Sequence, residues 1–147
     1  MKILHVFDHT LPLHSGYTFR SAAILRNQRK MGWDTCHLSG PKQLNCNTME
    51  EDADGLHFYR TPRPAGLLAR LPGGDPFAVM RAIEKRLLGL AKELQPDIIH
   101  AHSPVLDAVP AIRVGRKLGI PVVYEIRAFW EDAAVDHGST QEGSLRY

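Results

Sequence analysis

The stretch "KILHVFDHTLPLHSGYTFRSAAILRNQRKMGWDTCHLS", residues 2–39, decides the fold of this 147-residue chain. Residues 2–7 are a short apolar run rich in β-branched and aromatic residues, which predicts a buried strand. Residues 17–31 contain no Gly or Pro and end at Gly32, a natural helix C-cap, so they predict a helix. Residues 33–38 alternate roughly between apolar and polar positions before a Ser-Gly-Pro turn, which predicts a second strand.

The remainder of the chain continues this alternation. Residues 56–60, 97–101 and 120–126 are short apolar runs bounded by turn residues, and each predicts a further strand. Near-continuous apolar strands separated by amphipathic helices are typical of an α/β fold, with a mostly parallel sheet and helices on both faces. We therefore expect residues 1–147 to form a single domain of this class.

Two amphipathic helices separate the later strands. The clearer one begins at Asp75, a good N-cap, carries apolar residues at helical spacing and ends before Pro96. The other covers residues 105–118, and its Pro110 must lie in the first turn or introduce a kink.

Two polar segments predict surface loops. Residues 42–55 carry several carboxylates, and residues 61–74 are punctuated by Pro and Gly. Basic residues flank an apolar pair in the second region, which is compatible with a peripheral membrane contact, although the pattern favours an ordinary surface loop. These residues are Arg60, Arg63 and Arg70 around Leu67 and Leu68.

Bulk properties exclude several classes of protein. The net charge of +2 gives no electrostatic reason to expect a nucleic-acid partner. Cys36 and Cys46 form neither a disulfide framework nor zinc-site spacing, so we expect reduced thiols, with Cys36 facing a core. The N-terminus does not resemble a signal peptide, because its apolar run is interrupted by Asp8. We expect a cytoplasmic protein that is at most peripherally attached to a membrane.

The first turn raises the first functional question. Gly16 lies between the first predicted strand and the first helix, where backbone N–H groups can bind an anion. The surrounding residues match neither the dinucleotide fingerprint nor a P-loop, and a lone Gly before a helix also serves as permissive backbone. Spacing alone leaves both interpretations open.

The end of the fourth predicted strand carries His100 and His102. Residues two apart on a strand face the same side, so both imidazoles can converge on a cleft. Metal binding would need a third ligand, and none is evident by spacing. Alternatively, one histidine makes a structural hydrogen bond and the other is exposed.

Two residues of opposite charge lie where the fifth predicted strand ends. Glu125 and Arg127 alternate with apolar residues, and they form either a structural ion pair or a fixed guanidinium that binds an anionic substrate. Trp130 would then form a stacking wall. We expect Asp107 and the loop arginines to be solvated. Together these residues predict a polar cleft built by the loops that follow the first, fourth and fifth strands.

Three segments make the sequence similar to a known family. They are "KILHVFDHTLPLHSGYTFRSAAILRNQRKMGWD" (2–34), "PDIIHAHSPVLDAVPAIRVGRKLGIPVVYEIRAFWED" (96–132) and "VDHGSTQEGSLRY" (135–147). In combination they resemble the N-terminal domain of family 4 retaining glycosyltransferases, and most of all a branch from bacterial exopolysaccharide and exosortase-type gene clusters.

The resemblance implies the N-terminal half of a GT-B fold, in which two Rossmann-like, doubly wound domains face each other across a cleft. It implies a nucleotide-diphosphate sugar as donor, a glycan or lipid-linked hydroxyl as acceptor, retention of configuration, no cofactor and no metal. It further implies that a C-terminal donor-binding domain is absent from these residues, so we expect the chain alone to be inactive.

The resemblance assigns roles to particular residues. Catalytic roles fall to Arg127, Glu125 and His102, donor phosphate binding to Gly16 and Ser15, and acceptor or cleft-lining positions to His14, His100, Trp130 and Glu131. The sequence departs from the family where Arg127 replaces a common His and where Ser15-Gly16 replaces Gly-Gly. A nucleotide-sugar epimerase and a non-catalytic Rossmann-like binding or regulatory module are the alternatives.

Overall fold

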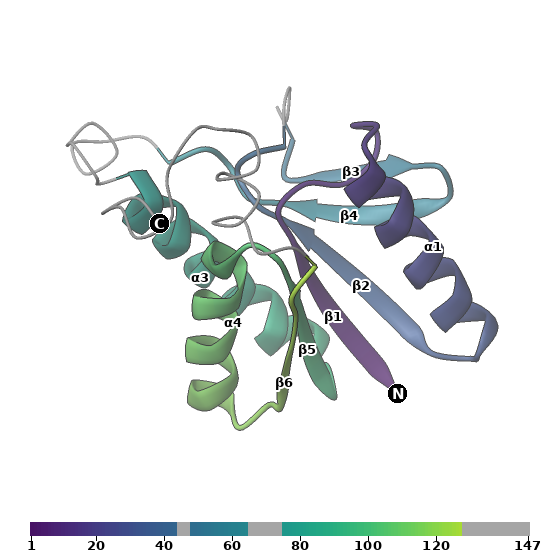
Figure 1. Cartoon of the computed structure of the whole chain (residues 1–147). Helices are drawn as coiled ribbons and strands as arrows, with labels where there is room; N and C mark the ends of the chain where they lie inside the picture. Colours follow the sequence, from purple (N-terminus) through teal and green to yellow (C-terminus); the bar gives the residue numbers. More distant parts are fainter. Residues whose placement is uncertain (44–47, 65–74, 128–147) are drawn as a thin grey trace, which may run out of the picture.

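Six strands form one sheet in the order β3-β4-β2-β1-β5-β6 (Figure 1). The computed structural model describes residues 1–43, 48–64 and 75–127. All neighbouring strands are parallel except β3 and β4, which pair antiparallel. In chain order the elements are β1 (Lys2–Phe7), α1 (Gly16–Lys30), β2 (Asp34–Ser39), β3 (Glu50–Ala53), β4 (Leu56–Arg60), α3 (Asp75–Leu94), β5 (Ile98–His102), α4 (Val105–Leu118) and β6 (Val122–Glu125).

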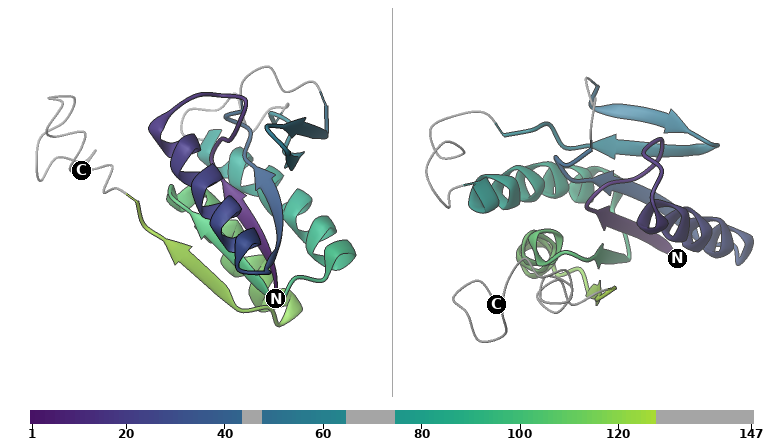
Figure 2. Two further views of the ribbon diagram at one scale, coloured as in Figure 1. Left: turned by 90° about the vertical axis from the view of Figure 1, so that its right-hand side faces the viewer. Right: turned by 45° about the horizontal axis from the view of Figure 1, so that its top comes forward.

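Helices cover both faces of the sheet: α1 lies on one face, and α3 and α4 lie together on the other (Figure 2). Because side chains alternate along a strand, β1 contributes to both layers. Leu4 and Val6 belong to the larger core beneath α3 and α4, whereas Phe7 packs with Leu25 of α1. Cys36 packs against the larger core, as expected, and burial raises the pKa of its thiol. The predicted α/β class with a doubly wound, mostly parallel sheet is confirmed.

The helix limits agree with the capping signals. Ser15 caps α1, its hydroxyl accepting the Thr18 N–H at 3.1 Å, and Gly119 ends α4 in the left-handed conformation. Pro110 lies inside α4, beyond its first turn. Of the two predicted alternatives, a position in the first turn is therefore wrong. Among the described helices, none combines the length and apolar character needed to cross a bilayer.

The segment predicted as a loop at 42–55 contains strand β3, so that prediction is wrong. The strand was not predicted because its residues are mostly Asp and Glu, which are unfavourable in strands. The signal was the Asp54-Gly55 dipeptide, which joins β3 to β4 with φ of 52° and 73°. Two successive positive φ values define the type I′ hairpin turn that Asp-Gly favours.

Asp107 is buried, with an exposed fraction of 1%, so the expectation that it is solvated is wrong. Arg60, the last residue of the third predicted strand, is buried as well, at 0%. Asp107 lies on the face of α4 that also buries Ala111 and Val114, and burial raises the pKa of its carboxyl well above the usual range. Because the Arg60 side chain points into the protein, it contributes nothing to a membrane contact. Leu67, Leu68, Arg70 and Cys46 lie outside the described residues.

Candidate functional site

The sheet reverses its direction of winding between β1 and β5, and ligands of open α/β sheets bind at the carboxyl ends of strands at such a switch point. One side chain of α1 spans this point. The Tyr17 hydroxyl accepts the N–H of Asp8, after β1, at 3.2 Å and donates to the carbonyl of Ser103, after β5, at 3.0 Å. The loops that line the switch point are therefore tied together by α1.

Arg127 is held against this bridge from several sides. Its side chain is 6% exposed, and its guanidinium lies 4.5 Å from the centre of the Tyr17 ring. Nη1 donates to the Ser21 hydroxyl at 2.8 Å, Nη2 to His102 Nδ1 at 2.7 Å and Nε to Glu125 Oε1 at 3.2 Å. The predicted pairing of Glu125 with Arg127 is present, and the guanidinium faces inward.

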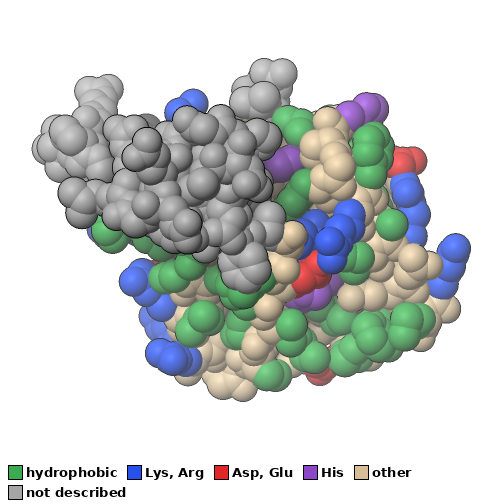
Figure 3. All heavy atoms as spheres, viewed as in Figure 1, with side chains coloured by type: hydrophobic (Ala, Val, Ile, Leu, Met, Phe, Trp, Pro, Cys, Tyr) green, Lys and Arg blue, Asp and Glu red, His purple; other side chains and the backbone are tan. Residues whose placement is uncertain are grey.

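Glu125 connects the buried groups to the surface. Its Oε1 also accepts from Arg20 Nη2 at 2.8 Å, while its Oε2 lies 3.1 Å from His102 Nδ1 and 3.4 Å from His100 Nε2. Figure 3 shows arginine or lysine, carboxylate and histidine atoms meeting on one face. We call Arg127, Glu125, His5, His100 and His102 the switch-point cluster.

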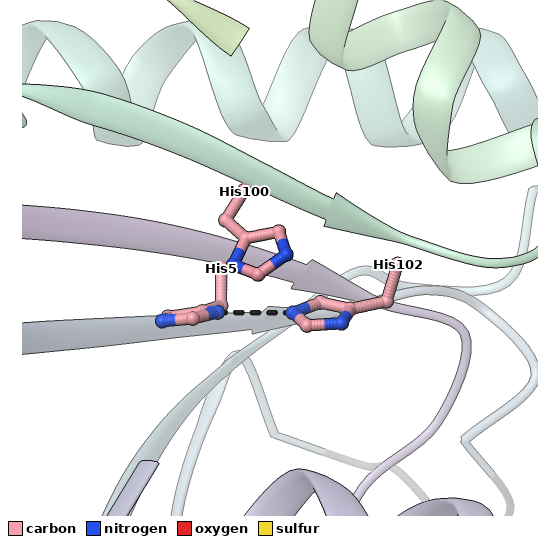
Figure 4. A group of neighbouring side chains, drawn as sticks. All are labelled: His5, His100 and His102. Atoms are coloured by element: carbon pink, nitrogen blue, oxygen red, sulfur yellow. Dashed lines mark hydrogen bonds between the residues drawn. The ribbon is translucent and has the colours of Figure 1, made fainter. Parts of the chain in front are cut away.

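Two histidines of this cluster, His102 and His5, form a hydrogen-bonded chain with a single proton arrangement. A guanidinium has only donors, so His102 Nδ1 must accept from Arg127, and the His102 proton lies on Nε2. That proton is donated to His5 Nδ1 at 3.0 Å (Figure 4). His5 then carries its own proton on Nε2 and donates it to Gln28 Oε1 at 2.8 Å.

Burial keeps this chain neutral. It lowers the pKa of His5 to about 3, with the neighbouring His100 and His37 adding to the effect. Burial, followed by His100 and Arg127, lowers the pKa of His102 as well. Both rings are therefore uncharged at neutral pH, as the proton arrangement requires.

A third imidazole, which was not evident from spacing in the sequence, joins His100 and His102. It is His5, which faces His100 directly in the register of β1 and β5. One nitrogen from each of the three rings lies within 4.8 Å of the others, a spacing that could hold a metal ion. The facing nitrogens of His5 and His102 already share a hydrogen bond, so an ion would have to displace that proton. The sequence signal was a histidine inside the buried run KILHVF.

Gly16 and Ser15 lie at the start of α1, close to the bridge. Ser15 is occupied, since its hydroxyl caps the helix and lies 3.0 Å from His9 Nε2. Gly16 does not have a left-handed φ, and a Cβ built on it meets no atom of the other described residues within 4 Å. Neither backbone strain nor packing against those residues therefore explains this glycine, and the space around its Cβ position is open among them.

His14 lies apart from the switch-point cluster. The ring centres of His14 and Phe19 lie 5.4 Å apart. Both residues line a cavity of about 310 Å³, and none of its described lining residues belongs to the switch-point cluster. Trp130 and Glu131 lie outside the described residues. A larger cavity of about 500 Å³ lies beside Asp8, whose carboxylate is 3.2 Å from Lys42 Nζ. Its lining was not recognised from the sequence, because it combines the ends of several elements.

A doubly wound sheet with a polar switch point defines the Rossmann-like class. Within that class, residues 15–147 match the family described as "Glycosyl transferase 4-like domain", and the chain belongs to this family. The predicted family 4 resemblance is thereby confirmed at the level of the family.

Curated and solved relatives are more distant. The chain is 24% identical over 124 residues to a GDP-mannose-dependent alpha-mannosyltransferase of Mycolicibacterium smegmatis, covering 84% of this chain and 31% of that protein. It thus spans about a third of the length of that relative. Its fold is similar to MurG of Acinetobacter baumannii (18% identity, TM-score 0.58, 92% of this chain and 38% of that chain). It is also similar to UDP-GlcNAc 2-epimerase of Neisseria meningitidis (17% identity, TM-score 0.56, 84% of this chain and 31% of that chain).

Proposed function

We propose that this chain is the acceptor-side, N-terminal half of a GT-B enzyme that transfers a sugar, with retention, from a nucleotide-diphosphate donor to a hydroxyl. The single observation that carries the proposal is the buried Arg127 paired with Glu125 at the switch point, in a member of the glycosyl transferase 4-like family. The product belongs to exopolysaccharide or glycoconjugate synthesis, and the site of action is cytoplasmic. The mannosyltransferase relative supports GDP-mannose as the first donor to test.

The chemistry of this reaction needs positive electrostatic potential. Transfer leaves a nucleoside diphosphate, so stabilisation of developing negative charge lowers the barrier. The N-terminus of α1 at Gly16 supplies the positive end of the helix dipole, and the N–H groups of a first helical turn can bind an anion. The Arg127 guanidinium lies behind it and keeps the surroundings positive.

The buried residues of the cluster act by positioning. Both ring nitrogens of His102 are engaged internally, so we assign it to orienting Arg127, in place of direct contact with a sugar hydroxyl. Glu125 is more accessible, at 20% exposure, and can accept a hydrogen bond from a substrate hydroxyl.

The test is a transfer assay with the longest reading frame that contains this chain, using GDP-mannose and then UDP-sugars. We expect Arg127→Ala to reduce turnover by about 10²–10³, the usual effect of removing a charge-stabilising group. Arg127→Lys keeps the charge but loses the forked geometry, so it should restore only part of the activity. Turnover near that of the wild type in Arg127→Ala contradicts the assignment.

An epimerase is the second candidate, since the fold is shared with UDP-GlcNAc 2-epimerase. Epimerisation or hydrolysis of the sugar nucleotide without an acceptor would favour it over transfer. A reading frame that turns over no sugar nucleotide would favour a non-catalytic binding module.

A further inference from the structure

A second arginine, Arg20, borders the switch-point cluster and differs from Arg127 in its freedom to bind a ligand. Arg20 lies on α1, one helical turn after Gly16, and its side chain is 58% exposed. Among the described residues, the polar contact that the structure gives its guanidinium is with Glu125, at 2.8 Å. Within the described part of the chain it is therefore a surface cation with one polar partner.

Arg127 lacks this freedom. Its Nε and both Nη atoms donate to groups on β5, β6 and α1, including the carbonyl of Tyr17 at 3.3 Å. Its backbone N–H donates to the Ser103 hydroxyl at 2.8 Å. A ligand could reach this guanidinium only by breaking the contacts that hold the switch point together.

Glu125 keeps a charged partner if the Arg20 side chain moves away from it. Arg127 Nε lies 3.2 Å from the same oxygen, Oε1, that Arg20 contacts, so the carboxylate stays paired when Arg20 moves away. Exposed ion pairs are weak and are readily exchanged for another partner. The exchange therefore leaves no buried charge unpaired.

Arg20 and Gly16 also lie on the same side of α1, because residues four apart on a helix are neighbours. One anion above the open space at Gly16 can therefore contact both the helix N-terminus and a forked guanidinium, the geometry that suits phosphate oxygens.

We propose that Arg20 is the ligand-facing cation of this site, which exchanges Glu125 for a phosphate group of an anionic substrate. The proposal rests on the proposed transfer function and adds to it the residue that contacts the charged group. The phosphate belongs either to the diphosphate of the donor or to a phosphorylated lipid acceptor.

The experiment compares Arg20→Gln with Arg26→Gln in this chain. Arg26 is a matched control, because it also lies on α1, is 47% exposed and is paired with a carboxylate, that of Asp54. Inorganic pyrophosphate represents the donor, and farnesyl phosphate represents a lipid acceptor. Calorimetry at constant ionic strength gives the dissociation constants, and thermal melts confirm that both variants fold.

We expect the wild type to bind at least one probe, Arg20→Gln to weaken that binding at least tenfold, and Arg26→Gln to change it less than twofold. Loss of pyrophosphate binding assigns Arg20 to the donor, and loss of farnesyl phosphate binding assigns it to the acceptor. Equal effects of the two substitutions, or a wild type that binds neither probe, overturn the proposal.

The two proposals fail separately. If the longer protein transfers sugar and Arg20→Gln retains the wild-type KM for donor and acceptor, only the Arg20 assignment fails. If no sugar transfer occurs, but Arg20→Gln loses anion binding while Arg26→Gln keeps it, the anion site stands and the transferase function fails.

Discussion

Arg60 and Arg127 stand at the same carboxyl edge of the sheet, on either side of its centre, and both side chains are buried. Arg60 bonds the carboxylate of Glu51 at 2.7 Å, the Leu11 carbonyl at 2.6 Å and the Ser39 hydroxyl at 3.0 Å. Through these hydrogen bonds Arg60 connects the loop after β1 to strands β2 and β3. The contacts of Arg127 instead continue through Glu125 to an exposed arginine. The partners of Arg60 end at Glu51, whose side chain is 35% exposed and pairs with no second cation among the described residues; we call this set closed, and it indicates a structural role. The partners of Arg127 continue to an arginine that is 58% exposed, which indicates a site.

The largest effect on stability should come from breaking the closed set. Arg60→Met leaves Glu51 and several buried acceptors without their donor, so the free energy of unfolding should fall by about 3 kcal/mol. Urea denaturation followed by circular dichroism measures it. Arg63→Met, at an exposed position, should change stability by less than about 0.5 kcal/mol. Equal losses in the two variants would contradict a structural role for Arg60.

The second test uses pH, because buried imidazoles lie both in the switch-point cluster, at His5, and on β2, where the His37 ring bonds the His57 carbonyl of β4. Burial lowers the pKa of His5 to about 3 and that of His37 to about 4. Below about pH 6.5 these two histidines bind protons in the unfolded chain but not in the folded chain. Their contribution to the free energy of unfolding is therefore fully present above that pH and is lost as the pH drops toward 4.

We expect each of these histidines to remove about 1.4 kcal/mol per pH unit within that window. Denaturation midpoints measured between pH 7 and pH 4.5 give the slope. His5→Gln should flatten it, whereas the exposed His14→Gln should leave it unchanged. An unaltered slope in His5→Gln would show that the ring is not buried in its neutral form.

A smaller loss is expected at the hairpin that supplies Glu51 to Arg60. Gly55 has φ of +73°, where a Cβ is strained, so Gly55→Ala should cost about 1 kcal/mol of unfolding free energy. Gly55→Asn is the control, because Asn tolerates this conformation better and should lose less. Thermal melts distinguish them, and a neutral Gly55→Ala would mean that the turn is not formed.

The smallest effect on stability should be at Gly16, where no contact with the other described residues requires glycine. Gly16→Ala should change the free energy of unfolding by less than about 0.5 kcal/mol, yet weaken pyrophosphate binding, because a methyl group then occupies the open space. Gly89→Ala, on an exposed position of α3, should leave binding unchanged. Unchanged pyrophosphate binding in Gly16→Ala would return this glycine to a purely permissive role.

The sequence predicted most of the fold because its strands and helices carry strong local signals. The apolar runs, the stop at Gly32 and the limits at Asp75 and Pro96 each depend on neighbouring residues alone. Strand β3 was missed because its carboxylates are unfavourable strand formers, and only pairing with β4 explains them.

The candidate site could be predicted only in part, for a related reason. Glu125, Arg127 and the two histidines of β5 were recognised because each pair lies close together in the sequence. His5 and Arg20 were missed because their place in the cluster depends on strand register and on the seating of α1. The burial of Arg60 likewise follows from the convergence of separate segments, which no short motif encodes.

The histidine chain has a direction, and that direction reports the position of Arg127. All three bonds from Arg127 through His102 and His5 to Gln28 donate the same way. If Arg127 withdraws, His102 Nδ1 can donate to Glu125 Oε2, 3.1 Å away, and every donor along the chain reverses once the Gln28 amide turns. The imidazole nitrogens then exchange protonated and unprotonated states without any change in net charge. Their ¹⁵N chemical shifts would thus record, from the interior of the sheet, whether the arginine at its edge is docked.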